Sequence, residues 1–147
     1  MSPLQPLIRI ANENDFEKIA EITNKHFPYM RMTPSKIQER ISKGCLYIVA
    51  VAEGSIVGFV DVKIKTGRAK VMGLAVEEGF RGKGVGSALL SKATELARER
   101  GITLVYLKVK RSNTNAIQFY EKHGFVFRKE VEKNGEGFYI MRRSLET

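Results

Sequence analysis

The sequence has little of the residue types on which disulfide-stabilised or metal-bound small domains depend. Among its 147 residues it has one cysteine, Cys45, and two histidines, His26 and His123. A single cysteine excludes an intramolecular disulfide framework and a cysteine-based zinc site. Neither histidine has neighbours at metal-ligand spacing, so we expect no metal.

Long apolar runs are also missing. No stretch approaches the roughly 20 apolar residues that a membrane-spanning helix needs. The first six residues lack the basic region and apolar run of a signal peptide. We therefore expect a cytoplasmic protein that does not contact a membrane.

Acidic residues are in the minority. The chain has 25 Lys and Arg against 16 Asp and Glu, which gives a formal net charge of +9. Such a surface favours anionic partners, whether nucleic acid, a phosphate-bearing cofactor or an acidic protein. Because 43% of the residues are hydrophobic, a packed core is expected and disorder is excluded. The length predicts one domain over residues 1–147.

The hydrophobic pattern predicts alternating groups of strands and helices. Strands are expected at 7–11, 46–53, 56–65, 69–76 and 104–109 and on both sides of the Asn134-Gly135 turn, with helices after 12–15, from 33 to 44, from 84 to 100 and from 115 to 123. The order is β-α-α-β-β-β-α-β-α-β-β. It indicates a mixed α/β domain in which helices cover a mostly antiparallel sheet.

One loop is rich in glycine. Four of the thirteen glycines fall within residues 79–86, between a predicted strand and a predicted helix. Bare backbone N–H groups and a helix N-terminus form a phosphate-binding site, and Arg81 and Lys83 add positive charge. A tight turn alone explains one glycine, but it does not explain three at alternate positions beside two cations. The spacing matches neither the Walker nor the Rossmann pattern.

Two motifs carry a resemblance to a known family. Arg81-x-x-Gly84-x-Gly86 resembles the pyrophosphate loop of the GCN5-related N-acetyltransferase (GNAT) superfamily, and residues 72–81 resemble the strand that leads into it. Residues 113–125, Asn-Thr-Asn-Ala-Ile-Gln-Phe-Tyr-Glu-Lys-His-Gly-Phe, are similar to the second signature of that family. The resemblance covers about residues 46–127, with the motifs in the family's order.

The resemblance implies a fold, a cofactor and a reaction. The implied fold is a mixed sheet of about seven strands, mostly antiparallel with a central splayed parallel pair, flanked by about four helices. Gly73 marks the expected bulge at which the splay begins. The implied activity is transfer of an acetyl group from acetyl-CoA to a primary amine by direct attack. The residues implied to bind acetyl-CoA are Leu74, Ala75, Val76, Arg81, Gly82, Lys83, Gly84, Val85, Gly86, Ser87, Asn113 and Tyr120.

Tyr120 is the implied catalytic acid, because a phenol can protonate the departing CoA thiolate; it can also be a helix-face tyrosine that packs on Phe119 and Phe125. Lys108 stands where many relatives have an acidic residue or histidine as general base. We interpret Lys108 as a solvated or CoA-facing cation and expect water to carry the acceptor's proton. Asp61 and Tyr139 are weaker base candidates.

The acceptor pocket is expected around residues 27–32, an aromatic and methionine-rich segment between the two N-terminal helices. The acceptor is a protein N-terminus, a lysine or a small-molecule amine. Two alternatives stay open: a non-catalytic CoA-sensing member of the family, and a nucleic-acid-binding module. The second is disfavoured because the basic residues are scattered along the sequence and no recognition motif is present. Pairing of C-terminal edge strands leaves a homodimer open.

Overall fold

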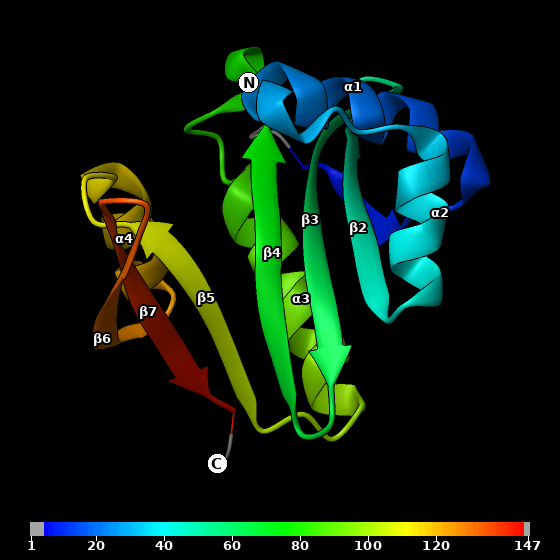
Figure 1. Ribbon diagram of the computed structural model, residues 1–147. Coiled ribbons are helices and arrows are strands. Elements are labelled where there is room, and N and C mark those ends of the chain that lie inside the picture. Colours follow the sequence, from blue (N-terminus) through cyan, green and yellow to red (C-terminus); the bar gives the residue numbers. More distant parts are fainter. Residues whose placement is uncertain (1–4, 146–147) are drawn as a thin grey trace.

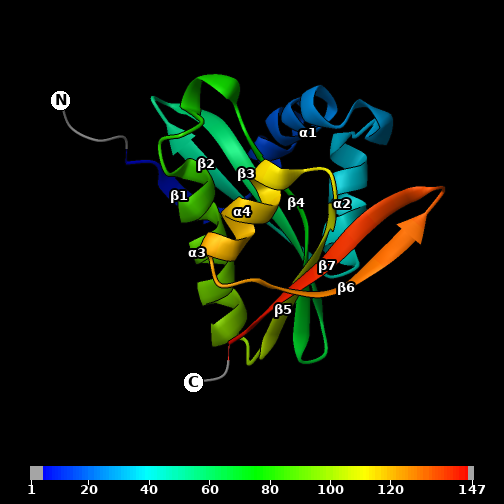
Figure 2. The same cartoon turned by 90° about the vertical axis from the view of Figure 1, so that its left-hand side faces the viewer.

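The computed structural model describes residues 5–145. Figure 1 shows one twisted sheet with helices on both faces. Its seven strands, in the spatial order β1-β2-β3-β4-β5-β7-β6, are β1 (Leu7–Ile10), β2 (Cys45–Ala52), β3 (Ser55–Lys65), β4 (Arg68–Val76), β5 (Leu104–Lys110), β6 (Val126–Lys133) and β7 (Glu136–Ser144). The helices are α1 (Phe16–His26), α2 (Pro34–Ser42), α3 (Val85–Glu99) and α4 (Thr114–Lys122), with short 3₁₀ turns at Glu13–Asp15, Pro28–Met30 and Glu78–Phe80. Turning the molecule shows α1 and α2 on one face of the sheet and α3 and α4 on the other (Figure 2).

The predicted order of elements is confirmed, and the boundaries follow from local chemistry. Asn12 caps the first helical turn, where its side chain accepts a hydrogen bond from the Asn14 amide at 2.9 Å. Thr33 caps α2 in the same way, accepting from the Lys36 amide at 3.1 Å, and Pro34 occupies the first helical position. Among residues 5–145, no helix is both long and apolar enough to cross a bilayer.

Two apolar cores lie on opposite faces of the sheet. The larger joins α3 to the central strands and includes Leu89, Val60 and Leu107, each almost fully buried. The smaller joins α1 and α2 to the sheet and includes Ile19, Ile37 and Val49. Where helices cover both faces, the central strands are rigidly held.

The centre of the sheet contains the expected splay. β4 and β5 are parallel neighbours, but their pairing extends only from Arg68↔Leu104 to Val71↔Leu107. The pairing of β4 with β3 shifts at the same height, because Asp61 faces Gly73 whereas Val62 faces Val71. Met72 is therefore the extra residue of a β-bulge, one position before the predicted Gly73. Beyond it, β4 and β5 separate.

Candidate active site

A large cavity lies where β4 and β5 separate. Its volume is about 800 Å³, and it is lined by the end of β4, the glycine-rich loop, the start of α3, one side of α4 and the end of α1. The lining residues are His26, Phe27, Leu74, Ala75, Val76, Phe80, Arg81, Gly82, Gly84, Val85, Gly86, Ser87, Asn115, Ala116 and Phe119. Nine of the residues predicted to bind acetyl-CoA are thus brought together. Ligand sites are typically concave and mostly apolar with a few directed polar groups, and this cavity has that character.

The glycine-rich loop leads directly into the N-terminus of helix α3. Gly82 and Gly84 have φ values of 74° and 83°, in the left-handed region that glycine adopts without strain. Gly84 is the N-cap of α3, and its carbonyl accepts the first helical bond from the Ala88 amide at 3.0 Å. The residues between Gly84 and Ala88 are Val85, Gly86 and Ser87. Their amides lie before the first helical hydrogen bond, so they are the orphan donors of a helix N-terminus. This is the arrangement that binds phosphate groups.

The two cations of the loop differ in position. The Arg81 Nε donates to the Val76 carbonyl at 3.1 Å, and its guanidinium lies 3.1 Å from His26 Nδ1. Arg81 is thereby held over the end of β4, at the wall of the cavity. Lys83 does not line the cavity, and its ammonium lies 5.9 Å from the Phe80 ring centre.

Helix α4 forms the opposite wall. Asn113 caps this helix by accepting a hydrogen bond from the Ala116 amide at 3.2 Å, so its side chain organises the wall instead of lining the cavity. A Cβ placed on Gly86 would lie 3.4 Å from the Phe119 ring, which shows how closely α3 approaches α4. Ser87 Oγ and His123 Nε2, 2.9 Å apart, add a polar link between the two helices.

Tyr120 packs among aromatic side chains on α4. Its ring centre lies 5.3 Å from that of Phe119 and 5.7 Å from that of Phe125, both edge-on. Burial raises the pKa of the Tyr120 phenol to about 12. The phenol is therefore protonated at neutral pH and able to donate a hydrogen bond or a proton. Tyr120 is not among the residues that line the large cavity.

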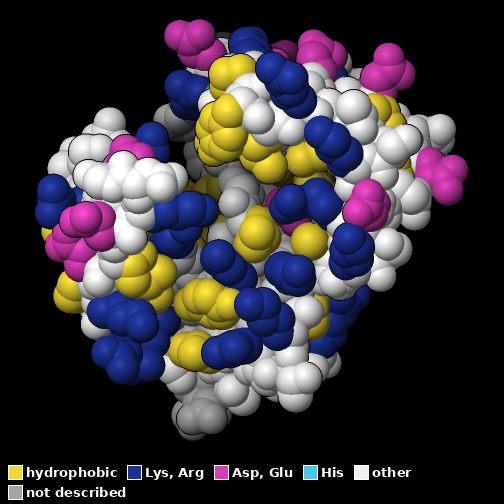
Figure 3. All heavy atoms as spheres, viewed as in Figure 1, with side chains coloured by type: hydrophobic (Ala, Val, Ile, Leu, Met, Phe, Trp, Pro, Cys, Tyr) yellow, Lys and Arg dark blue, Asp and Glu magenta, His cyan; other side chains and the backbone are white. Residues whose placement is uncertain are grey.

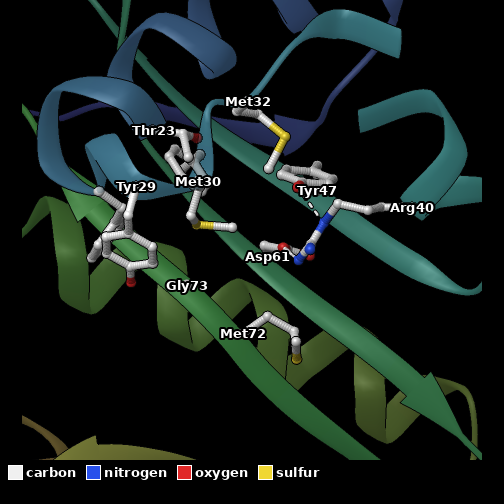
Figure 4. Close-up of a pocket in the computed structure, with 11 residues that line it drawn as sticks. Thr23, Tyr29, Met30, Met32, Arg40, Tyr47, Asp61, Met72 and Gly73 are labelled. Atoms are coloured by element: carbon white, nitrogen blue, oxygen red, sulfur yellow. Dashed lines mark hydrogen bonds and ion pairs between the residues drawn. The ribbon is translucent and has the colours of Figure 1, made fainter. Parts of the chain in front are cut away.

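A second, smaller cavity of about 60 Å³ adjoins the bulge in β4 (Figure 4). It is lined by Thr23, Phe27, Tyr29, Met30, Met32, Arg40, Tyr47, Phe59, Asp61, Met72 and Gly73. The predicted segment 27–32 therefore does surround a pocket. Phe27 lines both cavities, and Gly73 and Leu74, consecutive in β4, line one each. The two cavities thus share Phe27 and adjoin the same part of β4, next to the bulge.

Asp61 gives the smaller cavity a negative group. The alternation of apolar and polar residues along β3 places Asp61 on the polar side of the strand. It is nevertheless only 3% exposed, because α1 and α2 cover this part of the sheet. Arg40 from α2 forms an ion pair with Asp61 Oδ2 and also donates to the Tyr47 hydroxyl at 2.9 Å. Asp61 Oδ1 is buried and has no hydrogen-bond partner among residues 5–145. Burial raises the pKa of Asp61 and outweighs the opposing effect of Arg40.

The other base candidates lie elsewhere. Lys108 is exposed on β5, with its ammonium 4.9 Å from the Phe138 ring centre. Tyr139 packs edge-on against Phe127 at 4.9 Å. Neither residue lines one of the two cavities described above.

Sequence reasoning missed Arg40 and Tyr47 in the smaller cavity and Asn115 and Phe119 in the larger one. One signal was available for the smaller cavity. A lone aspartate at position 61, inside the apolar run from 56 to 64, indicates a buried carboxylate that needs a cationic partner.

A profile of the acetyltransferase (GNAT) family matches residues 14–125, about three quarters of the chain. The chain belongs to this family. Its place among the acyltransferases follows, and the sheet with its splayed parallel pair agrees with solved structures of that fold. The predicted family and fold are thus confirmed.

Individual relatives differ in their acceptors. The chain is 26% identical to a spermidine N(1)-acetyltransferase of Thermoplasma acidophilum, over 98% of this chain and 92% of that one. It is 27% identical to an N-alpha-acetyltransferase of Saccharolobus solfataricus, over 94% of this chain and 92% of the relative. The solved structure of the PaiA N-acetyltransferase from Thermoplasma acidophilum, in complex with coenzyme A, superimposes with a TM-score of 0.81 and 22% identity, over 96% of this chain and 99% of that one. At that identity the likeness concerns the fold.

Proposed function

We propose that the protein transfers the acetyl group of acetyl-CoA directly to a primary amine, with both substrates bound at once. The observation that carries the proposal is that two cavities adjoin the same part of β4, one lined by Gly73 and the other by Leu74, beside the bulge after which β4 and β5 no longer pair. One cavity has the amides and charge for a phosphate-bearing donor. The other has a buried carboxylate, Asp61, with one oxygen bound to Arg40 and the other without a hydrogen-bond partner, for a cationic acceptor.

The larger cavity suits coenzyme A in three respects. The start of α3 offers three orphan amides to the pyrophosphate, and Arg81 adds a cation beside them. The splayed end of β4 leaves main-chain groups at Leu74, Ala75 and Val76 without the partner that β5 gives to the paired half of the strand. Those that point toward β5, apart from the Val76 carbonyl, which accepts from Arg81, are available to the pantetheine arm as hydrogen-bonding partners for its amides. Asn113 supports this wall through its cap on α4.

The chemistry needs two proton transfers. The acceptor nitrogen attacks the thioester carbon, a C–N bond forms, the C–S bond breaks, and its electron pair leaves on sulfur. A main-chain N–H of the splayed β4 stabilises the negative charge on the carbonyl oxygen in the transition state. Tyr120, whose raised pKa keeps the phenol protonated, gives its proton to the leaving thiolate. The nitrogen must lose a second proton once the C–N bond has formed, and this proton returns to the Tyr120 phenolate through solvent.

Asp61 supplies what the acceptor amine needs. Asp61 lines the smaller cavity, and its Oδ1 is buried without a hydrogen-bond partner, so an alkylammonium that enters this cavity and displaces the side chains over Oδ1 gains a carboxylate partner. A charge-assisted hydrogen bond to Oδ1 both binds and orients the amine. The proton that the amine must lose before attack then passes to this carboxylate or through it to water. Arg40 keeps the carboxylate in place from the other side.

The test combines a binding and a turnover measurement on the intact chain. Calorimetric titration with acetyl-CoA, with NADH and ATP as controls, should give selective binding of acetyl-CoA. Release of free CoA thiol should then depend on an added amine, tested with N-terminal peptides, lysine peptides and polyamines. Selective binding without amine-dependent release from any acceptor would favour the non-catalytic sensor, and absence of binding would refute the assignment of the large cavity.

A further inference from the structure

The half of the sheet below α1 and α2 presents a basic face to solvent. Figure 3 shows Lys and Arg side chains gathered over the lower parts of β3, β4 and β5, with apolar side chains between them. We call this surface the basic face and define it by Lys63, Lys65, Arg68, Lys70, Tyr106, Lys108 and Arg142. These residues are scattered along the sequence, and the fold brings them together.

Strand register places these residues side by side. Lys63 of β3 lies opposite Lys70 of β4, and Lys70 in turn lies beside Tyr106 of β5. Tyr106 pairs with Arg142 of β7. Cross-strand partners point to the same side of a sheet. The face therefore runs across four strands, a width of about 14 Å at the usual strand spacing.

The positive charges crowd around the Tyr106 ring. Lys65 Nζ lies 5.6 Å and the Arg68 guanidinium 5.8 Å from the ring centre, and Lys65 also donates to the Tyr106 hydroxyl at 2.8 Å. Burial together with the nearby charge of Lys108 lowers the pKa of Lys70. Like charges held this closely destabilise one another until an anion binds between them.

Two acidic residues on the strands that form the face are already paired. Asp61 is bound to Arg40, and Glu136 lies 3.4 Å from Lys110. Within residues 5–145, no Lys or Arg of the basic face forms an ion pair with an Asp or Glu side chain. Its charge is therefore available to an external anion.

The basic face begins at the mouth of the smaller cavity. Met72 and Gly73 line that cavity, and Lys70 is the next residue of β4 on the same side as Met72. On β3, Asp61 and Lys63 share one side by the same alternation. An acceptor whose amine sits at Asp61 thus extends over lysines as it leaves the cavity.

We propose that the acceptor is the N-terminal amine of a polypeptide with acidic side chains within its first few residues. This rests on the proposed function and adds the acceptor class to it. The amine binds Asp61 Oδ1, and the following acidic residues bind the basic face. About four extended residues span its width. A polyamine carries further positive charges, which this face repels, so polyamines are poor acceptors here.

Matched peptides test the proposal. Two peptides of equal length share the first residue and carry either three acidic or three basic residues after it, with spermidine as a third acceptor. Steady-state release of CoA should give a kcat/KM for the acidic peptide at least ten times that for the basic peptide and for spermidine. The difference should reside in KM and shrink as NaCl rises from 50 to 500 mM.

Charge reversal identifies the surface. The double variant Lys70→Glu with Lys108→Glu should reverse the preference between the two peptides, whereas Lys92→Glu, on α3 at the other face of the sheet, should leave it unchanged. The binding of fluorescently labelled peptides to the acetyl-CoA-free protein, followed by anisotropy, gives the same comparison without turnover. Thermal melts check that each variant is folded.

Several outcomes overturn the proposal. Equal kcat/KM for both peptides, or a preference that survives the double variant, shows that the basic face does not select the acceptor. A single-stranded oligonucleotide that binds more tightly than the acidic peptide, and loses binding in the double variant, assigns the face to nucleic acid. The calorimetric titration distinguishes failure of this acceptor proposal from failure of the proposed function. Acetyl-CoA binding does not depend on the acceptor, so it persists if only the acceptor proposal is wrong.

Discussion

Val71 of β4 and Leu107 of β5 are the last residues that pair in the parallel ladder. The next residue of β4, Met72, is the extra residue of the bulge against β3. The bulge and the end of the ladder thus coincide, and a bulge both bends and twists the strand that carries it. This accounts for the opening of the sheet at the position that both cavities adjoin.

Replacing Tyr120 with phenylalanine should remove the proton donor and keep the packing. The ring contacts with Phe119 and Phe125 persist in Tyr120→Phe, so the fold should be retained. We expect kcat to fall about 100-fold, as is typical for loss of a general acid, with the dissociation constant of acetyl-CoA nearly unchanged. Stopped-flow measurement of CoA release separates the two quantities. The matched control is Tyr139→Phe, outside both cavities, and equal rates in the two variants would remove Tyr120 from the mechanism.

Replacing Arg81 with alanine should weaken the binding of acetyl-CoA. The variant loses a cation at the wall of the large cavity and the hydrogen bond to the Val76 carbonyl. A charge-assisted hydrogen bond contributes about 1.5–3 kcal/mol, which corresponds to about 10- to 100-fold in the dissociation constant. Calorimetry measures the change, with Arg98→Ala, exposed on the last turn of α3, as the control. An unchanged dissociation constant for Arg81→Ala would place the pyrophosphate elsewhere.

The fold was largely predictable because its signals are local. The strand alternation, the caps at Asn12 and Thr33 and the glycine-rich loop each act within a few residues, and together they specify the order of elements. The bulge was expected at Gly73, and the register shift lies between Gly73 and Val71, with Met72 as the extra residue. Pairing register depends on contacts between distant strands, and a single sequence does not show those contacts.

The candidate site was predictable only where a motif is contiguous. Nine predicted residues line the large cavity because the loop and the helix start are consecutive in the chain. Arg40, Tyr47 and Asp61 come from three elements, and their association depends on how α2 packs over β2 and β3. The basic face has the same origin. Such groupings arise from tertiary packing and have no spacing signal in the sequence.

Gly58 is required by the close approach of β3 to β4. A Cβ at this position would lie 2.8 Å from the Ala75 carbonyl oxygen and 3.3 Å from Leu89 Cδ1, so Gly58→Ala must displace the backbone of β4. Overpacking of this kind costs about 1–3 kcal/mol of the free energy of unfolding. Urea denaturation should show this loss. Gly79→Ala, where a Cβ meets nothing within 4 Å, is the control, and equal stability of the two variants would contradict the packing described.

Asp61 should control the binding of the acceptor in a pH-dependent manner. Because the pKa of Asp61 is raised by burial, its carboxylate forms at a higher pH than that of an ordinary aspartate. The kcat/KM for an amine should therefore fall as the pH drops through this raised value. In Asp61→Asn that acidic limb should disappear, and kcat/KM at pH 7.5 should be lower by about 10- to 100-fold, the loss expected for a charge-assisted hydrogen bond. An acidic limb that persists in the variant would exclude Asp61.

Asp15 provides a matched control, because it too is a buried aspartate bound to an arginine. Arg9 donates to both Asp15 oxygens, at 2.7 and 3.0 Å, and Asp15 lines neither of the two cavities at the bulge. Asp15→Asn should leave the kcat/KM for the acceptor unchanged at every pH at which the protein is folded.

The two aspartates should differ in how they affect stability with pH. The hydrogen bonds from Arg9 lower the pKa of Asp15, so its stabilising contribution is present above its ordinary pKa of 3.8 and is lost as pH falls through the lowered value. The pKa of Asp61 is raised, so its contribution is present below 3.8 and is lost as pH rises through the raised value. Relative to the unmodified protein, Asp15→Asn should lose more unfolding free energy as pH rises from 3 to 6, whereas Asp61→Asn should lose less. Urea denaturation of the three proteins across this pH range measures both trends. If the two variants instead follow the same trend, the pKa of Asp61 is lowered like that of Asp15, and Asp61 forms an ordinary ion pair with no carboxylate oxygen left for an amine.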